Sequence, residues 1–263
     1  MAITSLDDYI GAAKQRLLIS KAARSTSFQS ATSVIDVAGM PGAGVLAGTS
    51  TTAGVVPTDA DAGFPVINAF GGGALGYLTK IEFSNVAIAR MIVFDLLFKA
   101  GAYAYNANTG LTSQPSFASR VPNSDYKGLE IWAETVTATT GTQAWEVTYT
   151  NEGGTGSRTT GATSCGAAPG VGRMWRLPLQ TGDLGVQSID NVKGTVASAG
   201  TGNILVMRRL WTGRINGPLQ GEIIDLIGTG MPRVFDDSAL MVVVVADGTS
   251  TGACDLTIEI ANG

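Results

Sequence analysis

Two neighbouring segments near the end of the chain have opposite hydrophobic patterns. Residues 240–246 form an uninterrupted apolar run, typical of a strand covered on both faces. Residues 256–260 alternate between apolar and polar types, which predicts a strand with one buried and one wet face. The turn sequence DGTSTG lies between them, so the pair predicts a β-hairpin. We expect one face of the first strand to pack in the core, and the other to lie under a loose arm of the chain or against a neighbouring subunit.

Segments of the same kinds recur along most of the chain, separated by turns rich in Gly, Ser, Thr and Asp. They predict strands at 79–87, 90–99, 129–137, 144–151, 174–179, 186–192, 203–211, 222–227, 239–246 and 256–260. Short strands at this spacing are typical of an antiparallel β-sandwich or jelly-roll. The apolar stretch 91–98 also fits a buried helical turn. The predicted fold class is mainly β, with one jelly-roll-like sandwich domain over residues 77–263.

The N-terminal segment, residues 1–24, carries a helical pattern. Ser5 and Asp8 have the spacing of a capping box, and Asp7 and Asp8 suit the positive end of a helix dipole. An apolar stripe at helical spacing follows, made of Leu6, Tyr9, Ile10, Ala13 and Leu17. The pattern predicts an amphipathic helix that ends near residues 21–24 and docks its stripe on another surface.

Residues 25–76 have little periodicity. They are mostly Gly, Ala, Thr and Val, which is too apolar for a flexible linker and too rich in glycine for regular elements. This composition predicts an extended arm that runs over a surface, either of a neighbouring subunit or of its own chain.

Composition favours assembly over catalysis. Charged residues make up 14% of the chain, against roughly 25% in an average soluble domain, and a surface poor in charge is often buried between subunits. The net charge of −4 argues against nucleic acid as a partner, and no apolar run approaches the length of a membrane span. The chain contains no histidine, which removes the commonest general base and metal ligand. We expect no enzyme activity, no cofactor and no metal.

Several weaker motifs have simpler explanations. The sequence GGGALG at 71–76 matches a dinucleotide-binding glycine pattern, but a strand-like segment follows it instead of a helix. The acid pairs Asp7/Asp8, Asp59/Asp61 and Asp236/Asp237 lie where turns or helix starts favour Asp. The two cysteines are far apart, and we expect free thiols, with a single bridge as the alternative. The N-terminus lacks the apolar region of a signal peptide, so synthesis in the cytoplasm of a host cell is expected.

Arginine and tryptophan gather in two segments, GRMWRLPL and MRRLWTGRI. Both residue types are enriched at interface hot spots. The segments predict a subunit interface, ahead of ordinary packing at a sheet edge and of single-stranded nucleic acid. Together with the N-terminal stripe, the candidate interface residues are Leu6, Tyr9, Ile10, Leu17, Arg173, Trp175, Arg176, Arg208, Arg209 and Trp211.

Four phrases occur in an order that resembles a group of tailed-bacteriophage virion structural proteins. They are MAITSLDDYIGAAKQRL at 1–17, WEVTYTNEGGTGSRTTG at 145–161, RLPLQTGDLGVQSIDNVKG at 176–194 and GTGNILVMRRL at 200–210. The resemblance implies a place in the virion, as a capsid decoration or cement protein. Its partners would be the major capsid protein and copies of itself, with a trimer as the favoured homo-oligomer.

Two other functions stay open. One is a neck, tail or fibre component that binds a receptor. The other is a carbohydrate-binding or carbohydrate-active β-sandwich, which would place an aromatic residue such as Trp132 or Trp145 beside carboxylates in a concave site.

Overall fold

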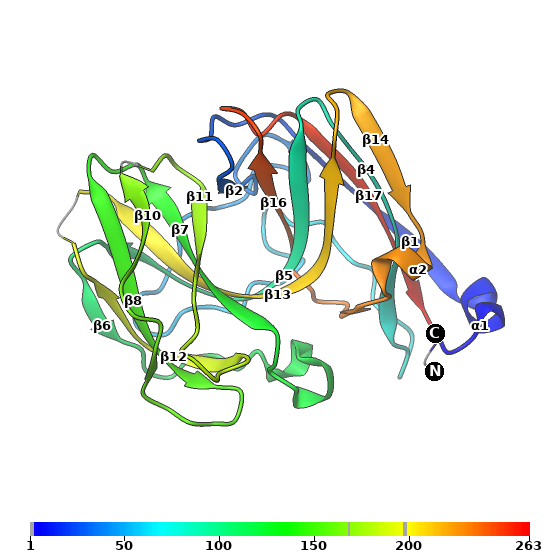
Figure 1. Ribbon diagram of the computed structural model, residues 1–263. Helices are drawn as coiled ribbons and strands as arrows, with labels where there is room; N and C mark the ends of the chain where they lie inside the picture. Colours follow the sequence, from blue (N-terminus) through cyan, green and yellow to red (C-terminus); the bar gives the residue numbers. More distant parts are fainter. Residues whose placement is uncertain (1–2, 168, 197–198) are drawn as a thin grey trace.

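Two long antiparallel strands, β5 (Ala89–Ala104) and β13 (Thr201–Ile215), run through both halves of the molecule. The computed structural model describes residues 3–167, 169–196 and 199–263. Figure 1 shows the pair passing from the lobe on the right of the view to the lobe on the left. Their register shifts at three points, and such bulges bend a strand pair. The bend lets one continuous pair serve both lobes.

A closed barrel forms around this pair. Its strand order is β11-β2-β16-β5-β13-β7, and closure leaves the barrel without a free edge. The remaining barrel strands are β2 (Ala31–Ser33), β7 (Leu129–Thr137), β11 (Arg173–Leu177) and β16 (Leu240–Ala246).

Two further antiparallel sheets flank the barrel, and we name each after a central strand. The β4 sheet consists of β14 (Gln220–Ile224), β4 (Gly76–Asn85), β17 (Cys254–Asn262), β1 (Ala13–Lys21) and β3 (Gly39–Met40), with β15 (Arg233–Val234) paired to β4. The β8 sheet consists of β10 (Thr163–Ala167), β8 (Thr142–Asn151), β12 (Val186–Gly194) and β6 (Asn108–Gly110), with β9 (Arg158–Thr159) paired to β8. The helices are short: α1 (Leu6–Gly11), η1 (Ala118–Arg120), η2 (Pro122–Ser124) and α2 (Leu226–Thr229).

The apolar strand β16 is buried on both faces by its own chain. Leu240, Val242 and Val244 pack into the core between the barrel and the β4 sheet. Met241 and Val243 face the barrel interior. That interior core also contains Ile35, Leu46 and Phe64 from the segment 25–76. Of the two expected alternatives, the arm and a neighbouring subunit, the structure shows the arm, which covers the second face of the strand together with the other barrel strands.

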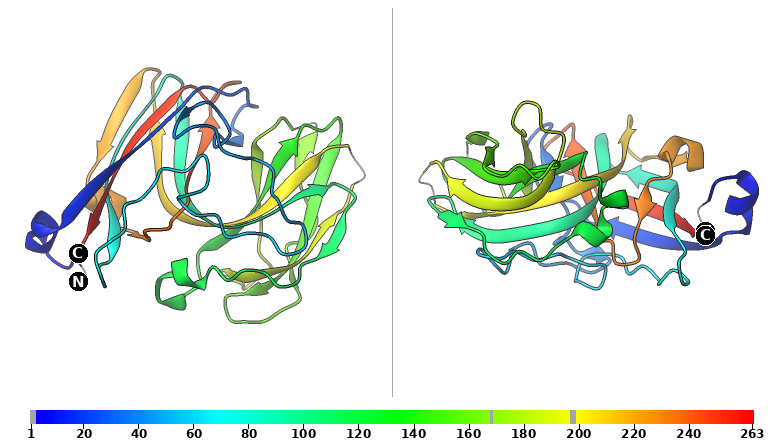
Figure 2. Two further views of the ribbon diagram at one scale, coloured as in Figure 1. Left: turned by 180° about the vertical axis from the view of Figure 1, so that it is seen from behind. Right: turned by 90° about the horizontal axis from the view of Figure 1, so that it is seen from below.

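The arm, residues 25–76, is mostly without regular structure, as predicted, but it contains the barrel strand β2 and the short strand β3. Figure 2 shows it crossing the rear of the barrel. Where β16 stops, the arm takes its place beside β5: the backbone N–H and C=O of Lys99 both bond to Val55 at 2.9 Å, and Gly101 N donates to Ser50 O at 3.0 Å. The buried Lys21 ammonium donates to four arm carbonyls, those of Ile35, Val37, Pro41 and Gly42. The arm is therefore fixed to its own chain.

The predicted N-terminal helix is much shorter than expected. It ends at Gly11, and residues 13–21 form β1, which pairs with β17 over its whole length. Leu17 and Ile19 are buried in alternation along this strand. Leu17 fits both patterns, since it lies at helical spacing from Ile10 and Ala13 and at strand spacing from Ile19. Pairing with β17 along the whole segment supplies the backbone hydrogen bonds of one edge and favours the strand. The strand at 90–99 is confirmed, and the alternative of a helical turn there is wrong.

None of the helices in the described part of the chain has the length and apolar character that a membrane span requires.

Candidate functional site

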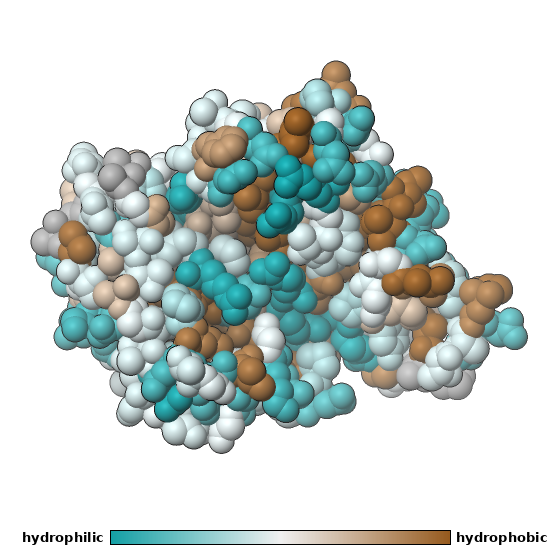
Figure 3. Space-filling view, viewed as in Figure 1, coloured by the Kyte–Doolittle hydropathy of each residue, from teal (hydrophilic) through white to brown (hydrophobic). Residues whose placement is uncertain are grey.

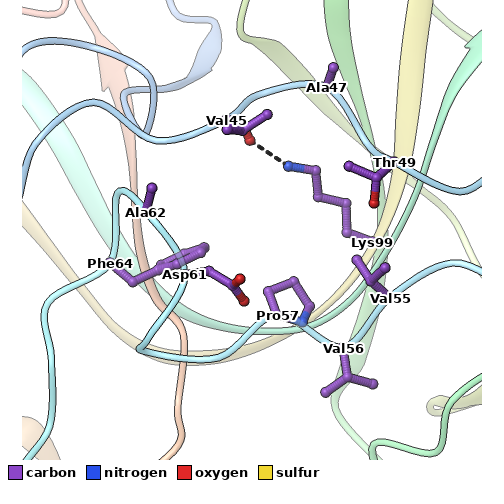
Figure 4. A pocket seen from close by; sticks show the side chains of 10 residues that line it. All are labelled: Val45, Ala47, Thr49, Val55, Val56, Pro57, Asp61, Ala62, Phe64 and Lys99. Carbon is purple, nitrogen blue, oxygen red and sulfur yellow. Dashed lines mark hydrogen bonds between the residues drawn. The ribbon is translucent and has the colours of Figure 1, made fainter.

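A cavity of about 300 Å³ lies between the arm and the second half of β5. Figure 4 shows Lys99 reaching across it toward Val45, with the carboxylate of Asp61 on another wall. Apart from Lys99, the lining comes from the arm: Val45, Ala47, Thr49, Val55, Val56, Pro57, Asp61, Ala62 and Phe64. The cavity is thus a mostly apolar space with one cation and one anion.

Lys99 is the basic group of this cavity. Its Nζ donates to the carbonyl of Val45 at 2.7 Å. Burial lowers the pKa of the Lys99 ammonium, while the nearby carboxyl groups of Glu134, Asp61 and Asp36 act in the opposite direction. A lysine whose charged form is disfavoured holds a larger fraction of neutral, nucleophilic amine than an exposed one.

Asn203 and Glu134 lie opposite each other on neighbouring barrel strands, and both are fully buried. Asn203 Nδ2 donates to Glu134 Oε2 at 2.8 Å and to Leu46 O at 2.7 Å. Asn203 Oδ1 accepts the backbone N–H of Gly48 at 2.9 Å. Burial raises the pKa of the Glu134 carboxyl, and Lys99 and Asn203 offset part of that rise. An amine, a carboxamide and a carboxyl group with a raised pKa therefore share one region beneath the arm.

A second buried cluster is centred on Asp95 of β5. Its Oδ1 pairs with Arg120 at 2.8 Å, and its Oδ2 pairs with Arg208 at 3.1 Å and accepts from Ser238 at 2.9 Å. Arg120 also donates to the carbonyls of Pro57, Leu96 and Asp237. These donors to the carboxylate all belong to the same chain, so the cluster joins β5, β13, η1 and the arm as a structural element.

Asp183 forms a third cluster, at the β8 sheet. Arg158 binds both of its oxygens, at 2.9 and 3.0 Å, and Tyr149 Oη and Asn151 Nδ2 donate to the same carboxylate. The hydrogen bonds from Arg158 lower the pKa of Asp183 from 3.8 to about 2, against the opposing effect of burial. This carboxylate stays ionised into acid solution.

We expect the Asp183 cluster to make stability depend on pH in the acid range. The pKa of Asp183 is lower in the folded chain than in the unfolded chain. The stabilisation is therefore fully present at pH values above the unfolded pKa of 3.8, and it is lost as the pH falls toward the folded pKa of about 2. The difference in urea midpoint between the wild type and Asp183→Asn should be constant from about pH 7 to about pH 5 and shrink below about pH 4. A difference that stays constant down to about pH 2 would contradict this assignment.

The structure does not bring the predicted interface residues together. Leu17, Trp175 and Trp211 are buried in the chain's own cores, so an interface role is wrong for them: their strands turn these side chains inward. Arg208 belongs to the Asp95 cluster. Arg209 pairs with Glu130 at 3.1 Å and lies over a phenylalanine ring.

The remaining candidates stay accessible. Arg176 is exposed and Arg173 half-buried. Tyr9 docks α1 on the β4 sheet through a hydrogen bond from Oη to Glu259 at 2.9 Å. Leu6 and Ile10, at 62% and 66% exposure, point away from the chain. The predicted docking of the helix stripe within this chain therefore involves Tyr9 alone.

Exposed apolar side chains gather at the end of the molecule where α1 and α2 lie. Figure 3 shows them along the right-hand edge, over α1, α2 and β14. α2 attaches to β4, where Thr229 Oγ1 donates to Leu78 O. α1 attaches through Tyr9 to Glu259 of the neighbouring strand β17, and Glu259 precedes Ile260, the residue paired with Leu78. The two attachment points are therefore adjacent. We call this surface the helix-end patch; its members are Leu6, Ile10, Ile223 and Ile227.

The other sequence motifs have structural roles. Asp59 and Asp61 accept backbone N–H groups of the arm, from Ile67 and Thr58. GGGALG leads into strand β4, not a helix. The two thiols are free, as expected. Across residues 3–167, 169–196 and 199–263, no group of three or more Cys, Asp or Glu side chains is arranged to hold a metal ion.

The two tryptophans considered for sugar binding are buried. Trp145 packs against Tyr103 and Tyr105. Trp132 does lie beside a carboxylate, since its Nε1 donates to Glu130 at 2.7 Å, but inside the barrel. Neither ring offers a face on which a sugar can stack.

No protein family and no curated protein matches the sequence. Solved structures with weak similarity include capsid proteins of infectious bursal disease virus. A mutant VP2 protein in derived T=1 particles is 9% identical, over 95% of this chain and 77% of that chain, with a TM-score of 0.16. The VP2 subviral particle is 9% identical, over 95% and 80% of the two chains, with a TM-score of 0.19. At these scores the neighbours establish no shared fold, and function rests on this chain's own geometry.

Proposed function

We propose that the chain is a structural protein of a bacteriophage virion that acts by binding, as a decoration or cement protein on the capsid shell. The observation that carries the proposal is the helix-end patch, whose four large aliphatic side chains are each more than 60% exposed. Large apolar side chains gathered on one surface are characteristic of interaction sites. The resemblance of four sequence phrases to virion proteins supports the same assignment.

The geometry suits a rigid binding module. The barrel is closed and the arm is bonded to its own strands, so little of the chain must be ordered on binding. A preordered surface loses less conformational entropy when it docks, and this favours affinity. The major capsid protein and further copies of this chain are the proposed partners, with a trimer as the proposed oligomer.

A copy number tests the location. The chain would be quantified by mass spectrometry against the major capsid protein in purified, DNA-filled particles. We expect copies comparable to those of the major capsid protein. A small ring-like number would move the chain to the neck or tail, and absence from particles would overturn the virion assignment.

Charge placed in the helix-end patch should weaken attachment to particles. We expect the double variant Leu6→Asp with Ile10→Asp to bind at least about tenfold more weakly, since burying each such side chain contributes about 1.5–3 kcal/mol. Binding of the labelled chain to particles stripped of it would be measured by co-sedimentation. Leu184→Asp is the matched control, because Leu184 is similarly exposed but belongs to the other lobe. Equal loss in both variants would contradict a role for the patch.

A further inference from the structure

Lys99, Asn203 and Glu134 project from the same inner face of the barrel. Residues directly opposite each other in an antiparallel sheet share a face. Lys99 is opposite Leu205, and Leu205 is opposite Trp132. Asn203 and Glu134 are opposite each other two residues further along their strands, on that same face. The amine, the carboxamide and the carboxyl group therefore project from one face of three adjacent strands, with the carboxamide bonded directly to the carboxyl group.

Both reacting groups bond to the arm, at neighbouring residues. Lys99 Nζ is held by the carbonyl of Val45, and Asn203 Nδ2 by the carbonyl of Leu46. Gly101, next to Asn203 across the strand pair, supplies the space for the carboxamide: a Cβ at Gly101 would lie 2.2 Å from Asn203 Oδ1. The bond from Asn203 to Leu46 is buried, whereas the bond from Lys99 to Val45 lies at the exposed side of the site.

We propose that Lys99 and Asn203 join spontaneously in an intramolecular isopeptide bond, with Glu134 as the proton-transfer group. The neutral amine of Lys99 leaves Val45 O and attacks Cγ of Asn203. A new bond forms between Nζ and Cγ, and the bond between Cγ and Nδ2 breaks. The amine loses one proton, and the departing nitrogen gains one and leaves as ammonia. No oxidant, reductant or other reactant is consumed.

Each neighbouring group has a role that its position supports. The backbone N–H of Gly48, at 2.9 Å from Asn203 Oδ1, stabilises the negative charge that develops on that oxygen during attack. Glu134, at 2.8 Å from Nδ2, is placed to protonate the leaving nitrogen. The carboxylate left behind then takes the proton of Nζ once that nitrogen is bonded to Cγ. Burial favours the neutral forms of both Lys99 and Glu134, and these are the forms that the first step requires.

The bond would link β5 and β13 at the part of the pair that carries the lobe with the β8 sheet. It would close covalently a strand pair that is otherwise held by hydrogen bonds. Such a link suits a protein that bears mechanical load, but its formation does not depend on where the protein acts.

The intact mass of the purified full-length chain tests the proposal. Under denaturing and reducing conditions, and allowing for removal of the initiator methionine, we expect a mass below the sequence mass by one ammonia. A tryptic digest should contain a branched peptide joining the segments around Lys99 and Asn203, with no cleavage after Lys99. The full sequence mass after prolonged incubation of the folded chain would overturn the proposal. Loss of water instead of ammonia would assign the bond to a carboxyl group such as Asp61 and overturn the role of Asn203.

Two variants test the roles of Lys99 and Glu134. Lys99→Arg keeps the charge but removes the nucleophile, and Glu134→Gln keeps the shape but removes the acid. We expect both to retain the full sequence mass. Lys127→Arg is the control at an exposed lysine and should still lose ammonia. A branched peptide that persists in Lys99→Arg would contradict the assignment, and circular dichroism would show that each variant is folded.

Discussion

Replacement of Asp95 by Ala is expected to lower the free energy of unfolding by about 3–5 kcal/mol, the usual cost of removing one partner from a buried ion pair. The side chains of Asp95 and Arg120 are 0% and 1% exposed, and the side chain of Arg208 is 12% exposed. Without the carboxylate, two guanidinium groups remain in the interior with only carbonyl partners. Chemical denaturation at neutral pH would measure the loss.

The control for this variant is an ion pair on the surface. Asp125 lies 3.8 Å from Lys127, and both side chains are more than half exposed. Asp125→Ala should change the free energy of unfolding by no more than about 1 kcal/mol, since exposed pairs contribute little. Comparable losses in the two variants would show that the Asp95 cluster is hydrated in solution and does not hold β5, β13, η1 and the arm together.

The strands were predictable because their pattern is local. Alternation in residues 256–260 and the apolar run 240–246 each indicate burial directly, and both segments form strands. The predicted hairpin between them is wrong, because β16 pairs with β2 and β5 in the barrel whereas β17 pairs with β1 and β4. The helix predicted over residues 13–21 is wrong because Leu17 fits the spacing of a helix as well as that of a strand. Their partner strand, β17, lies at the far end of the chain, and no local pattern indicates a pairing over that separation.

The candidate site was not predictable for the same reason. Lys99, Glu134 and Asn203 come from three strands, and each looks ordinary in its own segment. The one signal in the sequence is that each polar residue interrupts or borders an apolar strand pattern, as in DLLFKAG around Lys99. A polar residue inside a buried strand requires a partner, but the sequence does not identify which one. The interface prediction failed at Trp175 and Trp211 in a related way, since large aromatic side chains serve cores as well as interfaces.

Phe64→Ala tests whether the arm is part of the barrel. Phe64 is 6% exposed and packs in the barrel's interior core with residues of β5, β7, β13 and β16. If the arm closes the barrel, removing this ring should lower the free energy of unfolding by about 3–5 kcal/mol, as for other buried phenylalanines. Urea denaturation would measure the loss.

Val66→Ala is the matched control, two residues along the same arm at 67% exposure. It should change the free energy of unfolding by no more than about 0.5 kcal/mol. If Phe64→Ala is equally mild, the arm separates from the barrel without unfolding it, and the inner face of β16 becomes available to a partner. A large loss at Phe64 alone means instead that the arm folds with the barrel as one cooperative unit. Contacts with other subunits must then be made by surfaces outside that core, such as the helix-end patch.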